Sequence, residues 1–148
     1  MKTIILTAIA LSTGICSYAQ NISQSAVPSA VVNVFHQQFP KAADVEWEKK
    51  GDLYEVEFET GAFHRDHVLT MDAAGKVMGH TQEIPESEIP EAVILSIRQA
   101  FFGYKIDDPE KTTDANGKTS YKVELEKQNE EWIVTFSPDG KMIEKIPG

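Results

Sequence analysis

The sequence predicts an α+β fold: one helix followed by a four-stranded antiparallel sheet, repeated in tandem, with the helices on one face of the sheet. The first observation is an internal repeat, in which Val27–Val31 (VPSAV) returns as Ile89–Val93 (IPEAV) and Tyr54–Glu59 (YEVEFE) returns as Tyr121–Glu126 (YKVELE). The second is that each copy opens with apolar residues at helical spacing and continues with segments that alternate apolar and polar residues. A repeat of this kind indicates two similar structural units.

The chain has 148 residues, of which 14 are basic and 23 are acidic, and its formal net charge is −9. A chain of this length forms one domain or two small ones. Nucleic acids and anionic membranes bind basic protein surfaces, whereas this chain is acidic. We therefore expect a globular protein with no nucleic-acid partner.

Residues 1–19 have the pattern of a cleavable signal peptide. Lys2 supplies a positive start, Ile4–Ile15 is an uncharged and mostly apolar run, and the sequence SYA places small residues before a cut after Ala19. The apolar run is too short to span a membrane, which takes about 20 residues. We therefore expect a chain that begins at Gln20, has no membrane span, and is periplasmic or secreted.

The only cysteine, Cys16, lies inside this segment. Lipid attachment at Cys16 is the alternative to cleavage after Ala19, but Ile15 is larger than the residue that lipoprotein signals usually place before the cysteine. Cleavage after Ala19 leaves no cysteine, and therefore no disulfide, no thiol chemistry and no cysteine-ligated zinc. We expect the mature chain to depend on its hydrophobic core for stability.

A helix is predicted at the start of each copy, with Pro28 and Pro90 at the first helical position, where proline is favoured. Pro40 and Gly103 are expected to end the two helices. Each helix has a stripe of apolar residues three or four positions apart, which predicts one buried face. The stripes are Val31, Val34, Phe35 and Phe39 in the first copy and Val93, Ile97, Ala100 and Phe101 in the second.

Antiparallel strands are predicted after each helix, because apolar and polar residues alternate there with a period of two. In such strands one face packs on the core and the other faces water. The last strand of each copy, at 76–81 and 141–146, alternates less clearly, and its faces stay unassigned. The strands with clear alternation lie at 44–48, 54–59, 67–71, 121–126 and 132–136.

The two copies are placed at residues 20–84 and 85–148. The sequence that joins them, Pro85–Glu88 (PESE), is short and does not have the composition of a flexible linker. We therefore expect the two copies to form one compact unit, and the sequence leaves open whether their two sheets are continuous.

Several motifs follow one another along the chain: Val27–Val31 (VPSAV), Trp47-Glu48, Tyr54–Phe58 (YEVEF), Met71–Val77 (MDAAGKV), and Ile84-Pro85 before Ile89-Pro90. In this order they resemble the PepSY-like, beta-lactamase-inhibitor-like family of exported bacterial proteins. The resemblance covers nearly all of the chain after the predicted signal peptide. It implies a repeat of helix and antiparallel sheet without catalytic residues.

The same resemblance suggests a function. PepSY domains are thought to restrain peptidases, and the beta-lactamase inhibitor presents a concave sheet to its target. The disulfides of that inhibitor are absent here, and its inhibitory loop has no recognisable counterpart. The resemblance therefore implies an exported, non-catalytic binding module, peptidase-regulating or inhibitor-like, that uses its exposed sheet face.

An acidic sheet face is the predicted binding surface. Several glutamates would share one face of two neighbouring strands, and like charges opposite one another destabilise a sheet. The basic surface of an envelope protein would relieve this repulsion; the alternative is a solvated face relieved by Arg65, Lys49 and Lys50. The predicted partner-binding residues are Glu46, Glu48, Glu55, Glu57, Glu59, His64, Val68, Glu124 and Ile133.

A calcium site is the basis of the alternative function. Asp107, Asp108, Asp114 and Asn116, with Glu110 between them, supply oxygen donors of the kind that bind calcium, although their order does not match the EF-hand loop. Asn116 followed by glycine also predicts a simple hairpin turn. The alternative to a binding module is a calcium-responsive periplasmic structural or sensor protein, and no other cofactor is expected.

The histidines do not predict a metal site. His64 and His67 are three positions apart on a predicted strand, so their side chains would point to opposite faces. His36 and His80 are expected to be isolated. No nucleophile motif such as G-x-S-x-G occurs in the sequence. We therefore predict no enzymatic activity.

Overall fold

The computed structural model describes residues 20–148, so the predicted signal peptide and Cys16 lie outside the described residues. Two α-helices and nine β-strands make up the described part, and every strand pairing is antiparallel. None of its helices is long and apolar enough to cross a membrane. In chain order the elements are β1 (Gln20–Ile22), a 3-10 turn (Gln24–Ala26), α1 (Ser29–Gln38), β2 (Ala43–Lys50), β3 (Leu53–Thr60), β4 (Arg65–Asp72), β5 (Val77–Glu83), a second 3-10 turn (Glu86–Glu88), α2 (Glu91–Ala100), β6 (Lys105–Asp114), β7 (Thr119–Lys127), β8 (Glu130–Phe136) and β9 (Met142–Pro147).

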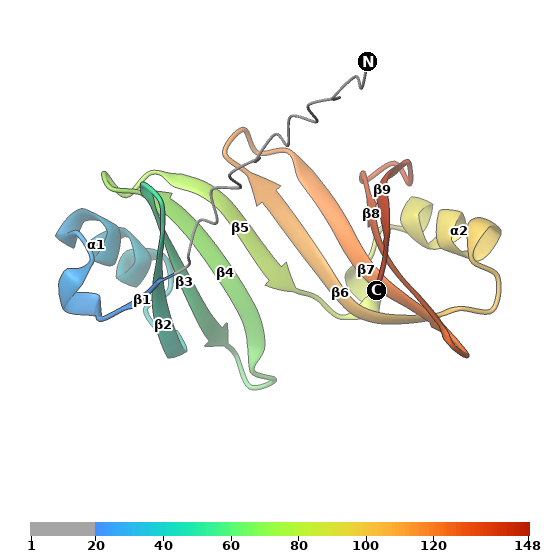
Figure 1. Ribbon diagram of the computed structural model, residues 1–148, viewed down its shortest axis with the longest axis horizontal. Helices are drawn as coiled ribbons and strands as arrows, with labels where there is room; N and C mark the ends of the chain where they lie inside the picture. The colour runs from blue at the N-terminus through green and yellow to red at the C-terminus, as the bar shows by residue number, and fades with distance from the viewer. Residues whose placement is uncertain (1–19) are drawn as a thin grey trace, which may run out of the picture.

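All nine strands belong to one sheet, in which each strand lies beside its neighbours in the chain from β1 to β9 (Figure 1). Two features go beyond the expectation of a four-stranded sheet in each copy. First, β5 pairs with β6, from Gly79 opposite Asp114 to Glu83 opposite Glu110, so the strands of the two copies form a continuous sheet. Second, β1 adds a strand at one edge.

The short strand β1 occupies on β2 the place that the end of β5 occupies on β6. Gln20 lies opposite Lys49 in the first pair, and Gln82 lies opposite Lys111 in the second. Three residues are too few to show the periodicity of a strand, and the sequence pattern therefore did not predict β1. Its backbone covers part of β2, which would otherwise be an unpaired edge.

Both helices begin one residue later than predicted, because Pro28 and Pro90 are N-cap residues with an extended backbone. The backbone N–H of Val31 donates to the carbonyl oxygen of Pro28 at 3.0 Å, and that of Val93 donates to Pro90 at 2.9 Å. Proline suits the start of a helix because the first backbone N–H groups have no partner within the helix, so the missing N–H of proline is not needed there.

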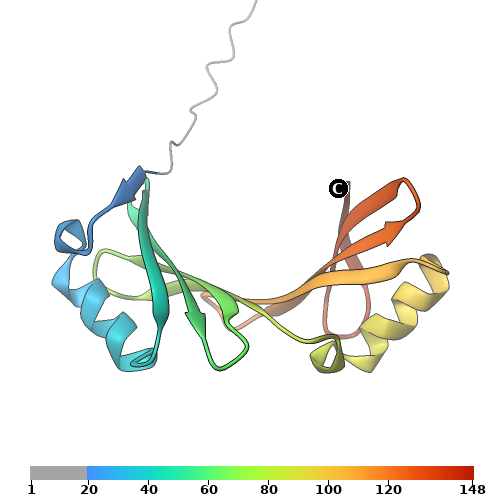
Figure 2. The same ribbon diagram turned by 90° about the horizontal axis from the view of Figure 1, so that it is seen from below.

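Both helices lie on the same face of the sheet. Directly opposed residues of antiparallel strands share a face, and the register places His67 opposite Gln82, Gln82 opposite Lys111, and Lys111 opposite Tyr121. His67 packs against Phe58 beneath α1, whereas Tyr121 belongs to the core beneath α2. Figure 2 shows the helices on the outer side of the curved sheet, so that the helix-free face is the concave one.

The helix side of the sheet carries two separate hydrophobic cores, one for each helix. In the first, the ring centroid of Phe35 lies 5.0 Å from that of Phe58 and 5.3 Å from that of Trp47. The polar side chains of Gln82 and Lys111 occupy this face between the cores. The buried residues are Val27, Val31, Phe35, Trp47, Val56, Phe58, Leu69 and Met71 in the first core, and Ile84, Ile89, Val93, Ile97, Phe101, Tyr121, Val123, Leu125, Val134 and Phe136 in the second.

Candidate binding face

The helix-free face presents carboxylates of neighbouring strands directly opposite one another. Glu46 on β2 lies opposite Glu57 on β3, and Glu48 lies opposite Glu55. Glu57 in turn lies opposite Val68 on β4. Opposed residues share a face, so the structure brings these predicted partner-binding residues together in the first half of the sheet.

A hollow of about 250 Å³ lies at the middle of this face, where the two halves meet. Val68 on β4 and Thr81 on β5 form the uncharged part of its lining. Glu124 lines it from β7, and Ile133 on β8 lies directly opposite Glu124. Four consecutive strands, β4 to β7, contribute the carboxylates of the hollow: Asp66, Glu83, Asp108, Glu110 and Glu124.

Sequence reasoning missed most of this hollow. Asp66 and Glu83 were not predicted as site residues, and Asp108 and Glu110 were considered only as oxygen donors for calcium. These residues come together because β5 pairs with β6. This pairing joins the two copies, and the alternation of apolar and polar residues within one copy does not predict it. The weak alternation of 76–81 also left the faces of β5 unassigned.

A β-bulge shapes one wall of the hollow. The register of β6 on β7 shifts between Asp107 and Glu110, and Asp108 has a positive φ of 39°. Aspartate adopts positive φ more readily than most residues, and bulges often redirect a side chain. The backbone N–H of Ile84 donates to the carbonyl oxygen of Pro109 at 2.9 Å, which joins the two halves beside the bulge.

The negative charge of the hollow is only partly compensated. The Nζ atom of Lys122 lies 2.8 Å from the carboxylate of Glu110. Burial, and after it the carboxylates of Asp108 and Glu131, raise the pKa of Glu124. A nearby cation would favour the charged form of Glu124 and lower this pKa again. The hollow is therefore chemically suited to a positively charged group.

By contrast, Glu48 and Glu55 are paired within the chain. The Nζ atom of Lys50 lies 3.4 Å from Glu48 Oε2 and also donates a hydrogen bond to Glu55. The hydrogen bond to Glu55 is the main reason that the pKa of Lys50 is raised. Arg65, another cation expected to relieve this face, instead lies 3.3 Å from the carboxylate of Glu88. The acidic face is thus compensated by Lys50 at Glu48 and Glu55, whereas the hollow keeps most of its negative charge.

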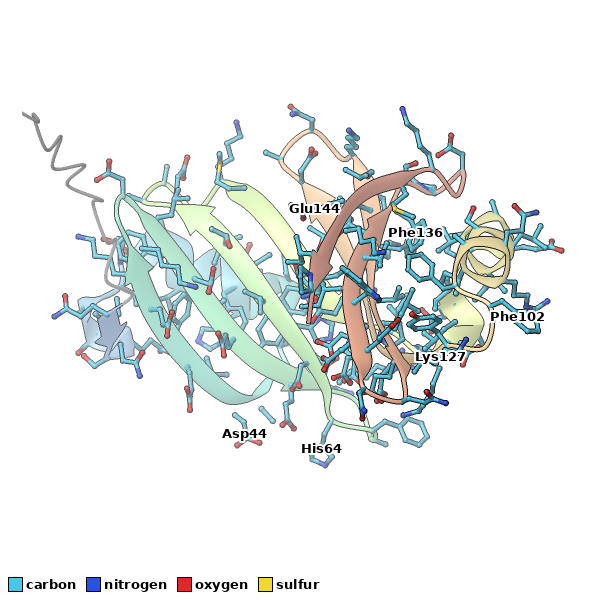
Figure 3. All side chains as sticks on the ribbon, turned by 45° about the vertical axis from the view of Figure 1, so that its right-hand side comes forward. Asp44, His64, Phe102, Lys127, Phe136 and Glu144 are labelled. Atoms are coloured by element: carbon cyan, nitrogen blue, oxygen red, sulfur yellow. The ribbon has the colours of Figure 1, made fainter. Side chains whose placement is uncertain are left out.

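Glu59 and His64 lie at the rim of the face, beside the turn between β3 and β4. His64 Nδ1 is 2.6 Å from Glu59 Oε2, and Asp44 lies close to His64 (Figure 3). Asp44 sits in a bulge of β2 with a φ of 48°, so it does not follow the regular alternation. Within residues 20–148 two groups have donor atoms close enough to hold a metal ion: Asp44, Glu59 and His64, and Glu48, Glu55 and Glu57.

The four residues predicted for calcium do not converge. Asp107 and Asp108 lie near the start of β6, whereas Asp114 is its last residue. The carboxylate of Asp114 accepts the backbone N–H groups of Asn116 at 2.8 Å and of Lys118 at 2.9 Å. It therefore closes the hairpin turn between β6 and β7, and the geometry does not favour the calcium alternative.

The prediction that His80 is isolated is wrong. His80 Nε2 lies 3.0 Å from His67 Nδ1, and the two rings are stacked with their centroids 5.3 Å apart. The pairing of β4 with β5 brings the two histidines together, a contact that residue spacing alone does not reveal. His67 is buried and His64 is exposed, as expected. However, His64 lies in the turn before β4 and not on the strand, so strand alternation is not the reason for its exposure.

Solved structures from Bacteroides species share this fold. A "putative periplasmic protein" from Bacteroides eggerthii is 15% identical with a TM-score of 0.72, and the match covers 82% of this chain and 88% of that chain. A BLIP-like protein from Bacteroides fragilis is 22% identical with a TM-score of 0.65, and the match covers 81% and 86%. At these identities the likeness shows the fold alone.

The sequence itself matches a family model. The family described as "putative beta-lactamase-inhibitor-like, PepSY-like" matches twice, over residues 15–79 and 76–144. No curated protein matches the sequence. The two matches follow one another along the chain as the two helices and their strands do, and together they cover most of it. The chain therefore belongs to the PepSY-like, beta-lactamase-inhibitor-like family.

Proposed function

We propose that this protein is an exported, non-catalytic binding module that holds a protein partner on its helix-free face, as an inhibitor would. The observation that carries the proposal is the acidic hollow at the middle of that face. Both helices pack on the opposite face, so they leave the hollow open to a partner. Membership in an inhibitor-like family supports this function.

The partner is an envelope protein that presents a basic segment. Carboxylates from four strands line the hollow, and a lysine or arginine placed there would form charge-assisted hydrogen bonds. Val68 and Ile133 would add apolar contact on either side. Complementary charge also speeds the encounter of two proteins, and salt weakens this effect. More specifically, we propose that the partner is a peptidase of the envelope, because PepSY domains are thought to restrain peptidases.

Replacing Glu57 and Glu124 together by glutamine is expected to slow association with the partner about tenfold at low salt. Both side chains belong to the helix-free face, one in each half. Glu55 is less suitable, because Lys50 and Thr70 already donate hydrogen bonds to its carboxylate. The partner is first recovered from envelope extract with the unmodified protein. Its rate of association with each variant is then measured at several salt concentrations.

The matched control removes two carboxylates on the helix side, Glu86→Gln with Glu91→Gln. Glu91 opens α2, and Glu86 lies in the 3-10 turn before it. This variant has the same net charge as the first and is expected to associate almost like the unmodified protein. If both variants slow association equally, the loss of net charge explains the effect, and the position of the carboxylates on the helix-free face does not. If the first variant associates at an unchanged rate, the helix-free face is not the binding surface.

Export is the other part of the proposal, and the related protein from Bacteroides eggerthii is called periplasmic. We expect the mature chain to begin at Gln20, the residue that opens β1. The intact mass of protein purified from the cell envelope checks this. A mass that includes Cys16 with an attached lipid would contradict it and would make the protein a lipoprotein.

A further inference from the structure

His67 and His80 form a pair on the helix side of the sheet, at the border of the first core. The exposed fraction of His67 is only 8%. Its ring is stacked between that of Phe58, 5.0 Å away between centroids, and that of His80, 5.3 Å away. The ring of Phe39 lies 5.5 Å from that of His80. The pair thus packs as part of the core and also links β4 to β5.

The hydrogen bond between the two rings depends on their protonation. His67 Nδ1 and His80 Nε2 are 3.0 Å apart, and the other ring nitrogen of His67 lies 2.7 Å from Thr60 Oγ1. One of the two facing nitrogens must be unprotonated to accept the hydrogen bond. When both rings are charged, both nitrogens carry protons, and the contact becomes a repulsion between like charges.

The surroundings favour neutral rings. Burial is the largest cause that lowers the pKa of His67 and the pKa of His80. Lys111 acts in the same direction on His80. The charged or titratable groups on the elements around the pair are Arg65 and Asp66 on β4, Lys111 on β6 and the exposed His36 on α1, whereas Gln82 on β5 and Thr60 on β3 are neutral.

The second half has a different pair in the same place. Trp132 lies on β8 where His67 lies on β4, and Lys145 lies on β9 where His80 lies on β5. The Nζ atom of Lys145 is 3.6 Å from the ring centroid of Trp132 and 5.2 Å from that of Phe101. This cation–π contact holds a lysine against a ring face and, unlike the histidine pair, does not need an unprotonated ring nitrogen to accept a hydrogen bond.

We propose that the contact between His67 and His80 is an acid-sensitive latch, which holds β4 against β5 near neutral pH and opens when the rings take up protons. Only the first half contains it, so acid loosens this half while the second half keeps its packing. Val68 on β4 and Thr81 on β5 line the acidic hollow on the opposite face of the same strands. Opening the latch therefore loosens one wall of the proposed binding face.

The lowered pKa of both histidines sets the direction of the pH effect. In the unfolded chain a histidine titrates near pH 6.5, above the lowered values in the folded protein. As the pH falls below about 6.5, the unfolded state binds protons before the folded state does, and stability decreases. The contribution of the pair to stability is therefore present above about pH 6.5 and is lost below it.

Amide hydrogen exchange of residues 20–148 at about pH 7.5 and pH 5 tests the latch, after correction for the intrinsic pH dependence of exchange. We expect the protection of β4 and β5 to fall about tenfold or more in acid, with little change in β7 and β8. The double variant His67→Trp with His80→Lys installs the pair of the second half and should abolish the loss. The control His36→Gln should retain it.

An equal loss of protection in both halves would overturn the proposal, and so would an undiminished loss in the double variant. A second measurement needs no variant: an NMR titration of the histidine rings in the unmodified protein. We expect His67 and His80 to titrate below about pH 6.5. If either histidine titrates at or above that value, the latch is refuted. Neither measurement needs a binding partner, so the latch can fail while the proposed function stands.

Discussion

Replacing Phe35 by alanine is expected to lower the free energy of unfolding of the first half by about 3–5 kcal/mol, the usual cost of removing a buried aromatic ring. The side chain is completely buried and packs against the rings of Trp47 and Phe58. Its neighbours stand on a helix and on two strands that are held by backbone hydrogen bonds. They cannot fill the space without moving the backbone, so a cavity remains.

The two tryptophans allow this loss to be assigned to one half. Trp47 belongs to the first core, whereas Trp132 packs against the second. Denaturant unfolding followed by Trp47 fluorescence, in a Trp132→Phe background, reports on the first half. Phe102→Ala is the matched control, because this ring is 83% exposed and its loss should change stability by no more than about 0.5 kcal/mol (Figure 3). A similar cost for both variants would contradict the importance of Phe35.

Gly140→Ala is expected to destabilise the second half by about 3 kcal/mol or more, from backbone strain and overpacking together. Gly140 has a φ of +84° in the turn between β8 and β9. An added Cβ would stand 2.8 Å from the carbonyl carbon of Ala92 and 2.7 Å from Ser96 Oγ, on α2. The hydroxyl of Ser96 also donates to the carbonyl oxygen of Gly140 at 2.6 Å. A methyl group here would push the turn away from the helix.

The matched control is Gly117→Ala, in the turn between β6 and β7. Its φ of +78° is nearly the same, but an added Cβ would meet nothing within 4 Å. Backbone strain alone should then cost about 1 kcal/mol. The difference between the two variants in thermal or denaturant unfolding measures the clash with α2. Equal costs would show that the turn at Gly140 is free to move, contrary to the close approach of its backbone to α2.

The candidate site was predictable only in part. The sequence placed Glu46, Glu57 and Val68 on one face, because side chains alternate along a strand wherever the strand is regular. It did not predict that Asp108 would join Glu83 at the same hollow. The two carboxylates come together because β6 has a bulge and because β5 pairs with β6. Both features depend on contacts between strands, which the sequence of a single strand does not reveal.

Features that depend on neighbours in the chain could be predicted from the sequence. Apolar spacing predicted α1 and α2, and the period of two predicted β2, β3, β4, β7 and β8, because helix and strand geometry bring residues three to four or two positions apart onto one face. The repeated motifs indicated the family that the match to both copies then established.

Contacts between segments that are distant in the chain became apparent only in the folded structure. It joined the strands of both copies into one sheet, placed β1 on the edge of β2, kept the two cores apart, and brought His67 against His80. The physical reason is that strand pairing is made by backbone hydrogen bonds, which nearly every residue type can form. Side-chain patterns therefore say which face of a strand is buried, but they say little about which strand lies beside it.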